Sequence, residues 1–116
     1  MATYIKINEN LYPATIGGRV HDHDWDNRES KAIRLKMTYA EAIELFANDV
    51  EWEIAQDVTR TLEMEDGTTS TVQDYEMFDN SEFSILGDII VHNDGTVTVK
   101  MGKPTAEELL AAFMEG

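Results

Sequence analysis

Residues 52–78 read WEIAQDVTRTLEMEDGTTSTVQDYEMF, and this stretch decides the fold. Its first half alternates: one face carries Trp52, Ile54, Val58, Leu62 and Met64, interrupted by Gln56 and Arg60, and the other carries Glu53, Asp57, Thr59, Thr61 and Glu63. A period of two is typical of a strand, and Glu65-Asp66-Gly67 is a hairpin turn signal. The stretch therefore predicts a hairpin in which residues 68–78 return antiparallel to residues 52–64.

Further strands are predicted on both sides of this hairpin. Residues 31–37 alternate, with Ile33, Leu35 and Met37 on one face and Arg34 and Lys36 on the other. Asn93-Asp94-Gly95 is the strongest hairpin signal in the chain and joins the strand-like residues 83–92 to residues 96–101. Residues 3–7 and 11–16 are two shorter β-rich runs before the Gly17-Gly18 turn.

Two helices are predicted, each opening with a capping box in which a threonine hydroxyl and a glutamate satisfy each other's backbone N–H groups. The boxes are Thr38 with Glu41 and Thr105 with Glu108, and they begin helices at about 38–50 and 105–114. Apolar residues at helical spacing then give each helix one face for packing. Hairpin links favour an antiparallel sheet, so we expect a single α+β domain over residues 1–116, with both helices packed on a mostly antiparallel sheet.

Composition excludes several classes of protein. The 116 residues contain no cysteine, which excludes a disulfide scaffold and a thiolate metal site. The formal charge of -14 argues against binding nucleic acid. No apolar run is long enough to cross a membrane, and the opening MATYIKINEN has no apolar signal core, so we expect neither a membrane span nor export.

The negative charge is concentrated in the middle of the chain. Residues 37–99 contain fifteen acids and one base, Arg60, whereas residues 1–36 contain five acids and six bases. Such asymmetry suggests a protein partner with a basic surface; a solvated acidic face that aids solubility is the alternative. The acidic candidates for partner contact are Glu44, Asp49, Glu53, Asp57 and Glu63. Tyr75 and Phe78 are candidate anchors within the acidic segment 74–82, although Tyr75 can instead belong to the core.

Chemistry has little support in the sequence. The segment His21–Asp26 offers histidine and carboxylate groups that suit divalent ions, but it lacks the glycine and the final glutamate of a calcium-binding EF-hand loop. We interpret it as a polar surface loop and predict no metal or other cofactor. No cysteine nucleophile, glycine-rich phosphate loop or serine elbow is present, so an enzyme is not expected.

Three stretches resemble those of small proteins encoded in prophages of Firmicutes, especially gut clostridia. They are YIKINENLYPATI at residues 4–16, RESKAIRL at residues 28–35 and GTVTVKMGKPT at residues 95–105. The resemblance covers most of the chain but brings no catalytic motif and no site residue. It implies a phage gene product that acts in the cytoplasm of a host bacterium or in the virion.

Two functions are carried forward from this context, and a third is weaker. The first is an inhibitor of a host defence system, similar to an anti-CRISPR protein, whose acidic surface occupies a basic groove. The second is a virion or tail-assembly component, which should expose a sheet edge or an apolar patch and form homo-oligomers. The third is a sponge for a nucleotide signal, for which Arg28, Lys31, Arg34 and Lys36 are the available cations. The sequence ranks the inhibitor slightly above the virion component.

Overall fold

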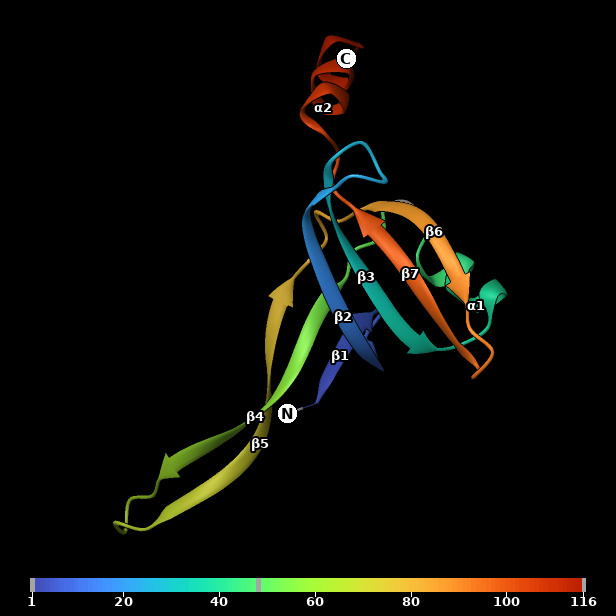
Figure 1. The fold of residues 1–116 in the computed structure, drawn as a ribbon. Coiled ribbons are helices and arrows are strands. Elements are labelled where there is room, and N and C mark those ends of the chain that lie inside the picture. The colour runs from blue at the N-terminus through green and yellow to red at the C-terminus, as the bar shows by residue number, and fades with distance from the viewer. Residues whose placement is uncertain (1, 48, 116) are drawn as a thin grey trace.

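The structure is a computed structural model that describes residues 2–47 and 49–115. Within these residues one seven-stranded sheet has the order β5-β4-β1-β2-β3-β7-β6, and every neighbouring pair is antiparallel (Figure 1). The strands are β1 (Thr3–Ile7), β2 (Asn10–Asp22), β3 (Arg28–Lys36), β4 (Glu53–Glu63), β5 (Thr69–Asp79), β6 (Ile85–Val91) and β7 (Thr96–Gly102). The predicted class, a mostly antiparallel α+β fold, is confirmed.

Hairpins form at Gly67 and Gly95 as predicted, whereas the turn predicted at Gly17-Gly18 is wrong: both glycines lie within β2 and pair with β3. Gly67 and Gly95 both have a φ of 86°, a left-handed conformation that costs glycine no steric penalty. At the β6–β7 turn, the Asp94 carboxylate also accepts a hydrogen bond from the backbone N–H of Thr96 at 3.0 Å. The β1–β2 turn uses Asn8 and Glu9, both with positive φ, and no glycine marks it in the sequence.

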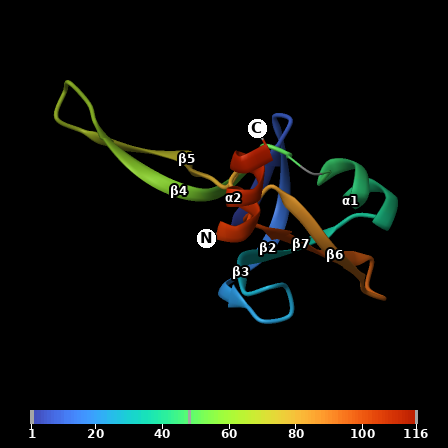
Figure 2. The same ribbon diagram turned by 90° about the horizontal axis from the view of Figure 1, so that it is seen from above.

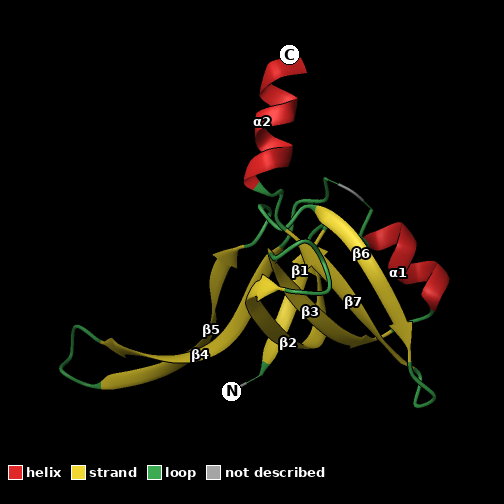
Figure 3. Cartoon of the chain, turned by 45° about the horizontal axis from the view of Figure 1, so that its top comes forward, coloured by secondary structure: helices red, strands yellow, loops and turns green. Residues whose placement is uncertain are grey.

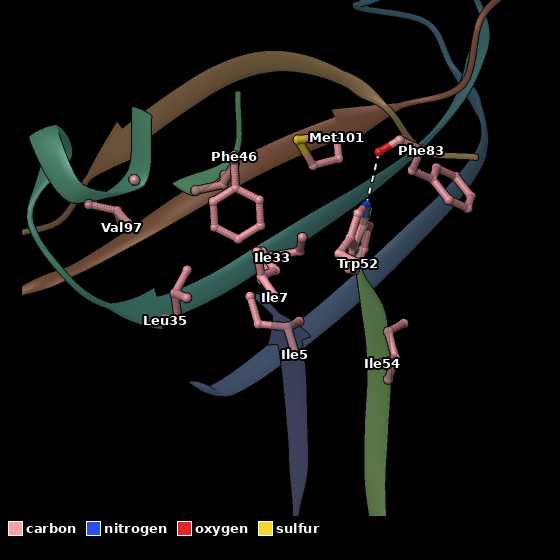
Figure 4. Close-up of a cluster of buried hydrophobic side chains, with 12 residues drawn as sticks. Ile5, Ile7, Ile33, Leu35, Phe46, Trp52, Ile54, Phe83, Val97 and Met101 are labelled. Atoms are coloured by element: carbon pink, nitrogen blue, oxygen red, sulfur yellow. Dashed lines mark hydrogen bonds between the residues drawn. The ribbon is translucent and has the colours of Figure 1, made fainter. Parts of the chain in front are cut away.

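The core lies on one face of the sheet, between the strands and α1 (Tyr39–Leu45) (Figure 4). The register places Ile5 opposite Ile54 and Ile33 opposite Val99, so these side chains share a face and are buried together. Trp52 closes the core at the start of β4, and its indole N–H donates to the backbone carbonyl of Phe83 at 3.0 Å. The predicted alternation of β3 and β7 is therefore the pattern that builds the core.

Helix α1 has the predicted capping box but is shorter than the predicted 38–50. The backbone N–H of Glu41 donates to the Thr38 hydroxyl at 3.1 Å, and the helix ends at Leu45. Ala42 and Phe46 are buried in the core, so this helix covers β6 and β7. The C-cap residue Phe46 has already left helical geometry, and Asp49, inside the predicted helix, has a left-handed conformation. Asn48, within the predicted helix, lies outside the described residues.

Helix α2 (Ala106–Glu115) also begins with its predicted box, because the backbone N–H of Glu108 donates to the Thr105 hydroxyl at 3.2 Å. The prediction that it packs on the sheet is not confirmed. Its apolar residues Leu109, Leu110, Phe113 and Met114 are 58–84% exposed. Figure 3 shows the helix projecting away from the strands. The helical pattern was sufficient to predict the element but not what it packs against.

The molecule is elongated. Its extents are 61 × 39 × 25 Å and its radius of gyration is 17.7 Å, against about 13 Å for a compact domain of this length. The accessible surface is 7999 Å², whereas a compact monomer of this mass exposes about 6,400 Å². The β4–β5 hairpin and α2 account for this shape, since both extend beyond the body (Figures 1 and 2).

Candidate binding surfaces

The outer part of the β4–β5 hairpin stands clear of the rest of the sheet. β4 pairs with β1 from Glu53 to Gln56, Asp57 adds hydrogen bonds to Ala2, and from Val58 onward the register pairs β4 with β5 alone. We call residues 57–75 the arm. Every residue of β5 is exposed, and this strand forms one edge of the sheet, so its outer side is not paired with another strand. The arm is therefore the part of the sheet that is open to another molecule.

One face of the hairpin carries an apolar stripe, which we define as Val58, Leu62, Val72 and Phe78. Phe78 lies opposite the core residue Ile54, so the stripe continues the core face of the sheet onto the arm. Leu62 is 46% exposed and Val72 is 38% exposed. Gln56, Glu76 and the Arg60–Asp74 ion pair lie on the same face, so the stripe is a row of exposed apolar side chains interleaved with polar ones. Exposed apolar side chains that gather on one face are a candidate interaction site.

The opposite face of the hairpin is polar and acidic. It carries Glu53, Asp57, Glu63 and Asp79, separated by Thr59, Thr61, Thr69, Thr71 and Gln73. Near the body the same face also holds the buried Ala55 and the exposed Met77. At its base the Tyr75 ring meets Tyr4 of β1 edge to face, with ring centroids 5.9 Å apart. This contact joins the arm to the body and leaves Tyr75 43% exposed.

The hairpin as a whole is strongly negative. Residues 53–79 contain eight acids and one base, Arg60. Arg60 Nε donates to Asp74 Oδ2 at 2.8 Å, so the hairpin's arginine is already paired. A backbone hydrogen bond from Tyr75, followed by the Arg60 contact, lowers the pKa of Asp74. Hydrogen bonds from Thr68 lower the pKa of Asp66 at the turn, so both carboxylates are ionised at neutral pH.

The seven residues predicted to contact a partner do not form one surface. Glu53, Asp57, Glu63 and Tyr75 share the acidic face of the hairpin, whereas Phe78 is on the opposite face. Glu44 is exposed on α1 and Asp49 follows that helix, at the β7–β6 side of the sheet. Glu44 and Asp49 were grouped with the hairpin residues because they are close to them in the sequence, which does not reveal the order of the strands. The alternation in the sequence shows that Val58 and Leu62 share a face of the strand, but it does not indicate that this face is exposed.

Helix α2 is attached to the body by one buried arginine. Arg28 is 6% exposed, and its guanidinium donates to Glu108 Oε1 at 2.7 Å and Oε2 at 3.3 Å. It also donates to the backbone carbonyl of Lys103 at 3.1 Å. The Arg28 contact is the main cause that lowers the pKa of Glu108 to about 2. This bidentate pair fixes the first turn of α2 while the apolar face beyond it stays exposed.

The segment His21–Asp26 turns one carboxylate inward. Asp22 is fully buried, accepts from the Ser30 hydroxyl at 2.8 Å and pairs with Lys100 Nζ at 2.6 Å. The Trp25 ring covers this pair, and Lys100 Nζ lies 5.7 Å from its centroid. Among residues 2–47 and 49–115, no three histidine, aspartate or glutamate side chains gather as metal ligands. The arrangement is that of an ion pair that fixes a loop.

A cavity of about 680 Å³ lies beside this ion pair, and its lining includes Gly17, Arg19 and Lys100. Both cations are committed to Asp22, and Arg19 also lies 3.8 Å from Asp24. The four cations considered for a nucleotide site do not converge. Arg28 pairs with Glu108, and Arg34 pairs with Asp94. Lys31 lies over the Phe83 ring, on the opposite face of β3 from Arg34 and Lys36. The structure thus offers no cationic pocket from these residues.

Comparisons with known proteins identify no relative. No protein-family model, curated protein or solved structure matches the chain at a significant level. In the part of the chain that the structure describes, neither helix has the length and apolar character needed to cross a membrane.

Proposed function

We propose that this chain is a structural subunit of a larger protein assembly, in which the arm and α2 contact neighbouring subunits. In the prophage context that the sequence resemblance implies, the assembly is a virion or tail, built in the cytoplasm of the host bacterium. The observation that carries this proposal is the surplus of accessible surface over that of a compact monomer. Subunits of assemblies carry such surplus surface because neighbouring subunits cover it.

The exposed edge of the sheet supports the same function. Soluble proteins usually protect edge strands with lysine, proline, bulges or short length. β5 is an eleven-residue strand, TSTVQDYEMFD, without lysine or proline, and the register of its pairing with β4 shows no bulge. Its charged residues are three acids, Asp74, Glu76 and Asp79, which favour a partner other than an acidic edge. An edge of this length is suited to contact with another chain. The features expected of an assembly component, an exposed edge and an apolar patch, are thus both present.

Fractionation of a phage-producing culture tests the proposal. The chain should sediment with assembled particles or their intermediates in about 1 M salt, because apolar contacts are not weakened by screening. A variant with Leu62→Asp and Val72→Asp should remain in the soluble fraction, while Thr61→Asp, on the opposite face of the arm, should sediment like the wild type. Wild-type chain that stays soluble at every stage of phage production would remove the proposal.

The inhibitor remains a second candidate, favoured by one observation. Glu53, Asp57 and Glu63 lie on one face of a hairpin that holds eight acids and one base. A projecting acidic hairpin can enter a basic groove as a nucleic acid does. Reversing these three charges to lysine should abolish inhibition of the host defence system with the fold intact. Unchanged inhibition would exclude the acidic face as the contact.

A further inference from the structure

Helix α2 needs a surface that its own chain does not supply. A helix of ten residues is marginal in water without tertiary packing, and α2 is anchored to the body in its first turn, where Glu108 accepts from the buried Arg28. Its second and third turns expose Leu109, Leu110, Phe113 and Met114. At about 100° per residue these four side chains lie on one side of the helix. The helix therefore presents one apolar face that has no cover in the monomer.

The arm offers exposed apolar side chains over a matching length, beside the Arg60–Asp74 ion pair on the same face. From Val58 to Leu62 the stripe spans about 13 Å at the rise of a strand, and a ten-residue helix spans about 15 Å. Both surfaces belong to one chain, but they point in different directions from the body (Figures 1 and 2). Within one copy α2 is held at Arg28 and cannot reach the arm, so the two surfaces can meet only between copies.

We propose that α2 of one copy packs on the apolar stripe of the arm of the next copy, in a head-to-tail contact that repeats through a ring or filament. This inference rests on the proposed assembly function and names the chain itself as the partner. Because donor and acceptor surfaces differ, the contact is heterologous and each copy uses both.

The surface of the monomer has the size that this arrangement needs. The observed 7999 Å² exceeds the compact value by about 1,600 Å². An interface of standard size covers about 800 Å² on each partner, so the surplus matches one contact made through α2 and a second made through the arm.

Charge sets the salt dependence of the contact. Each copy carries a formal charge of -14, and neither α2 nor the stripe brings a surplus of cations to the interface. Repulsion between copies is screened by salt, with a Debye length of about 10 Å at 0.1 M and about 3 Å at 1 M. Self-association through these surfaces should therefore strengthen as salt is added, whereas binding to a basic partner should weaken.

Complementation between two variants of the full chain tests the inference. Val72→Asp disables the arm and Phe113→Asp disables α2, and each exposed substitution leaves the core untouched. By size-exclusion chromatography with light scattering at about 1 M salt, wild type should form large species, and each variant alone should associate at least about tenfold more weakly. An equimolar mixture should give a species of twice the monomer mass and none larger, because one intact arm and one intact helix remain.

The control substitutions lie on the faces of the arm and of α2 that point away from the proposed contact. Thr61→Asp on the acidic face and Ala111→Asp on the opposite side of α2 should associate like the wild type. Large species from either variant alone, or no dimer in the mixture, would overturn the head-to-tail contact. If the mixture stays monomeric while the wild-type chain still sediments with phage particles through its arm, the proposed function stands and only this inference fails.

Discussion

At the scale of single residues, Gly102 shows how closely the loop before β3 fits the sheet. A Cβ at Gly102 would lie 2.7 Å from both Arg28 Cδ and the Trp25 ring, whereas a Cβ at Gly17 meets nothing within 4 Å. We therefore expect Gly102→Ala to displace Trp25 and lower the melting temperature, with Gly17→Ala as the matched control. Tryptophan fluorescence, read with Trp52→Phe as background, should shift to the red in the first variant only. Identical spectra would contradict the tight fit.

Asp22 should make the stability of the fold sensitive to acid. A hydrogen bond from Lys100, the largest cause, lowers the pKa of Asp22 to about 2. Because the folded pKa lies below the unfolded value, Asp22 stabilises the fold above about pH 4, and this is lost as pH falls through about 2. Asp22→Asn should unfold at lower urea than the wild type near pH 7, and this difference should shrink near pH 2. Asp24→Asn, an exposed control, should behave like the wild type at both values.

The sequence could not predict that two charged residues of this segment, Asp22 and Arg28, are buried, although most of the loop is exposed as expected. Residues 21–30 are almost entirely polar, and a polar surface loop was the expectation. The partners that allow Asp22 and Arg28 to be buried, Lys100 and Glu108, are far away in the chain. A polar segment indicates a loop, but only the tertiary contacts determine whether its charges are solvated or paired.

At the scale of elements, α2 should depend on its single anchor. Glu108→Gln removes the charge that pairs with Arg28 and weakens the capping box. Hydrogen exchange of residues 106–114 in dilute monomer should become faster, because the helix has little other support. Exchange of the core strands should change little, and Glu107→Gln should leave α2 as in the wild type. Unchanged exchange of α2 in Glu108→Gln would mean that the Arg28 pair does not hold the helix.

The arm should be dispensable for folding. Asp57 and Tyr75 lie directly opposite each other, so residues 58–74 can be replaced by an Asn-Gly turn that joins them. The body retains its whole buried core, in which Ile54 is the outermost β4 side chain of the apolar cluster. We expect a melting temperature within a few degrees of the wild type, roughly 1 kcal/mol, by thermal unfolding. A chain that fails to fold without these residues would show that the arm has a structural role.

Local patterns predicted the elements well and their environments poorly. Turn glycines and capping boxes act within a few residues, so the hairpin turns at Gly67 and Gly95 and both helix starts were correct. The alternation of β4 has the same period at Val58 and Leu62 as at Ile54. The pattern therefore cannot distinguish a core from an exposed interface, which is why the arm's apolar face was not foreseen.

At the scale of the whole molecule, the fold separates two chemically distinct surfaces. β1 pairs on one side with β2, its neighbour in the chain, and on the other side with the distant β4, and the pairing with β4 directs the hairpin away from α1. The acidic residues that the sequence grouped together are divided between the hairpin and the α1 side. Strand order depends on long-range contacts and cannot be read from a local motif. Because strand order determines which residues share a surface, the candidate site could be predicted only in part.

The central claim is that neighbouring subunits cover the exposed surfaces of this molecule. Sedimentation velocity of the wild-type chain tests this claim most directly. Measured over a range of concentrations at about 0.1 M and about 1 M salt, the chain should form species heavier than the monomer that grow with both variables. The chain lacking residues 58–74 should remain monomeric throughout. A single elongated monomer under every condition would contradict self-assembly and favour the acidic hairpin as a binding element for a basic partner.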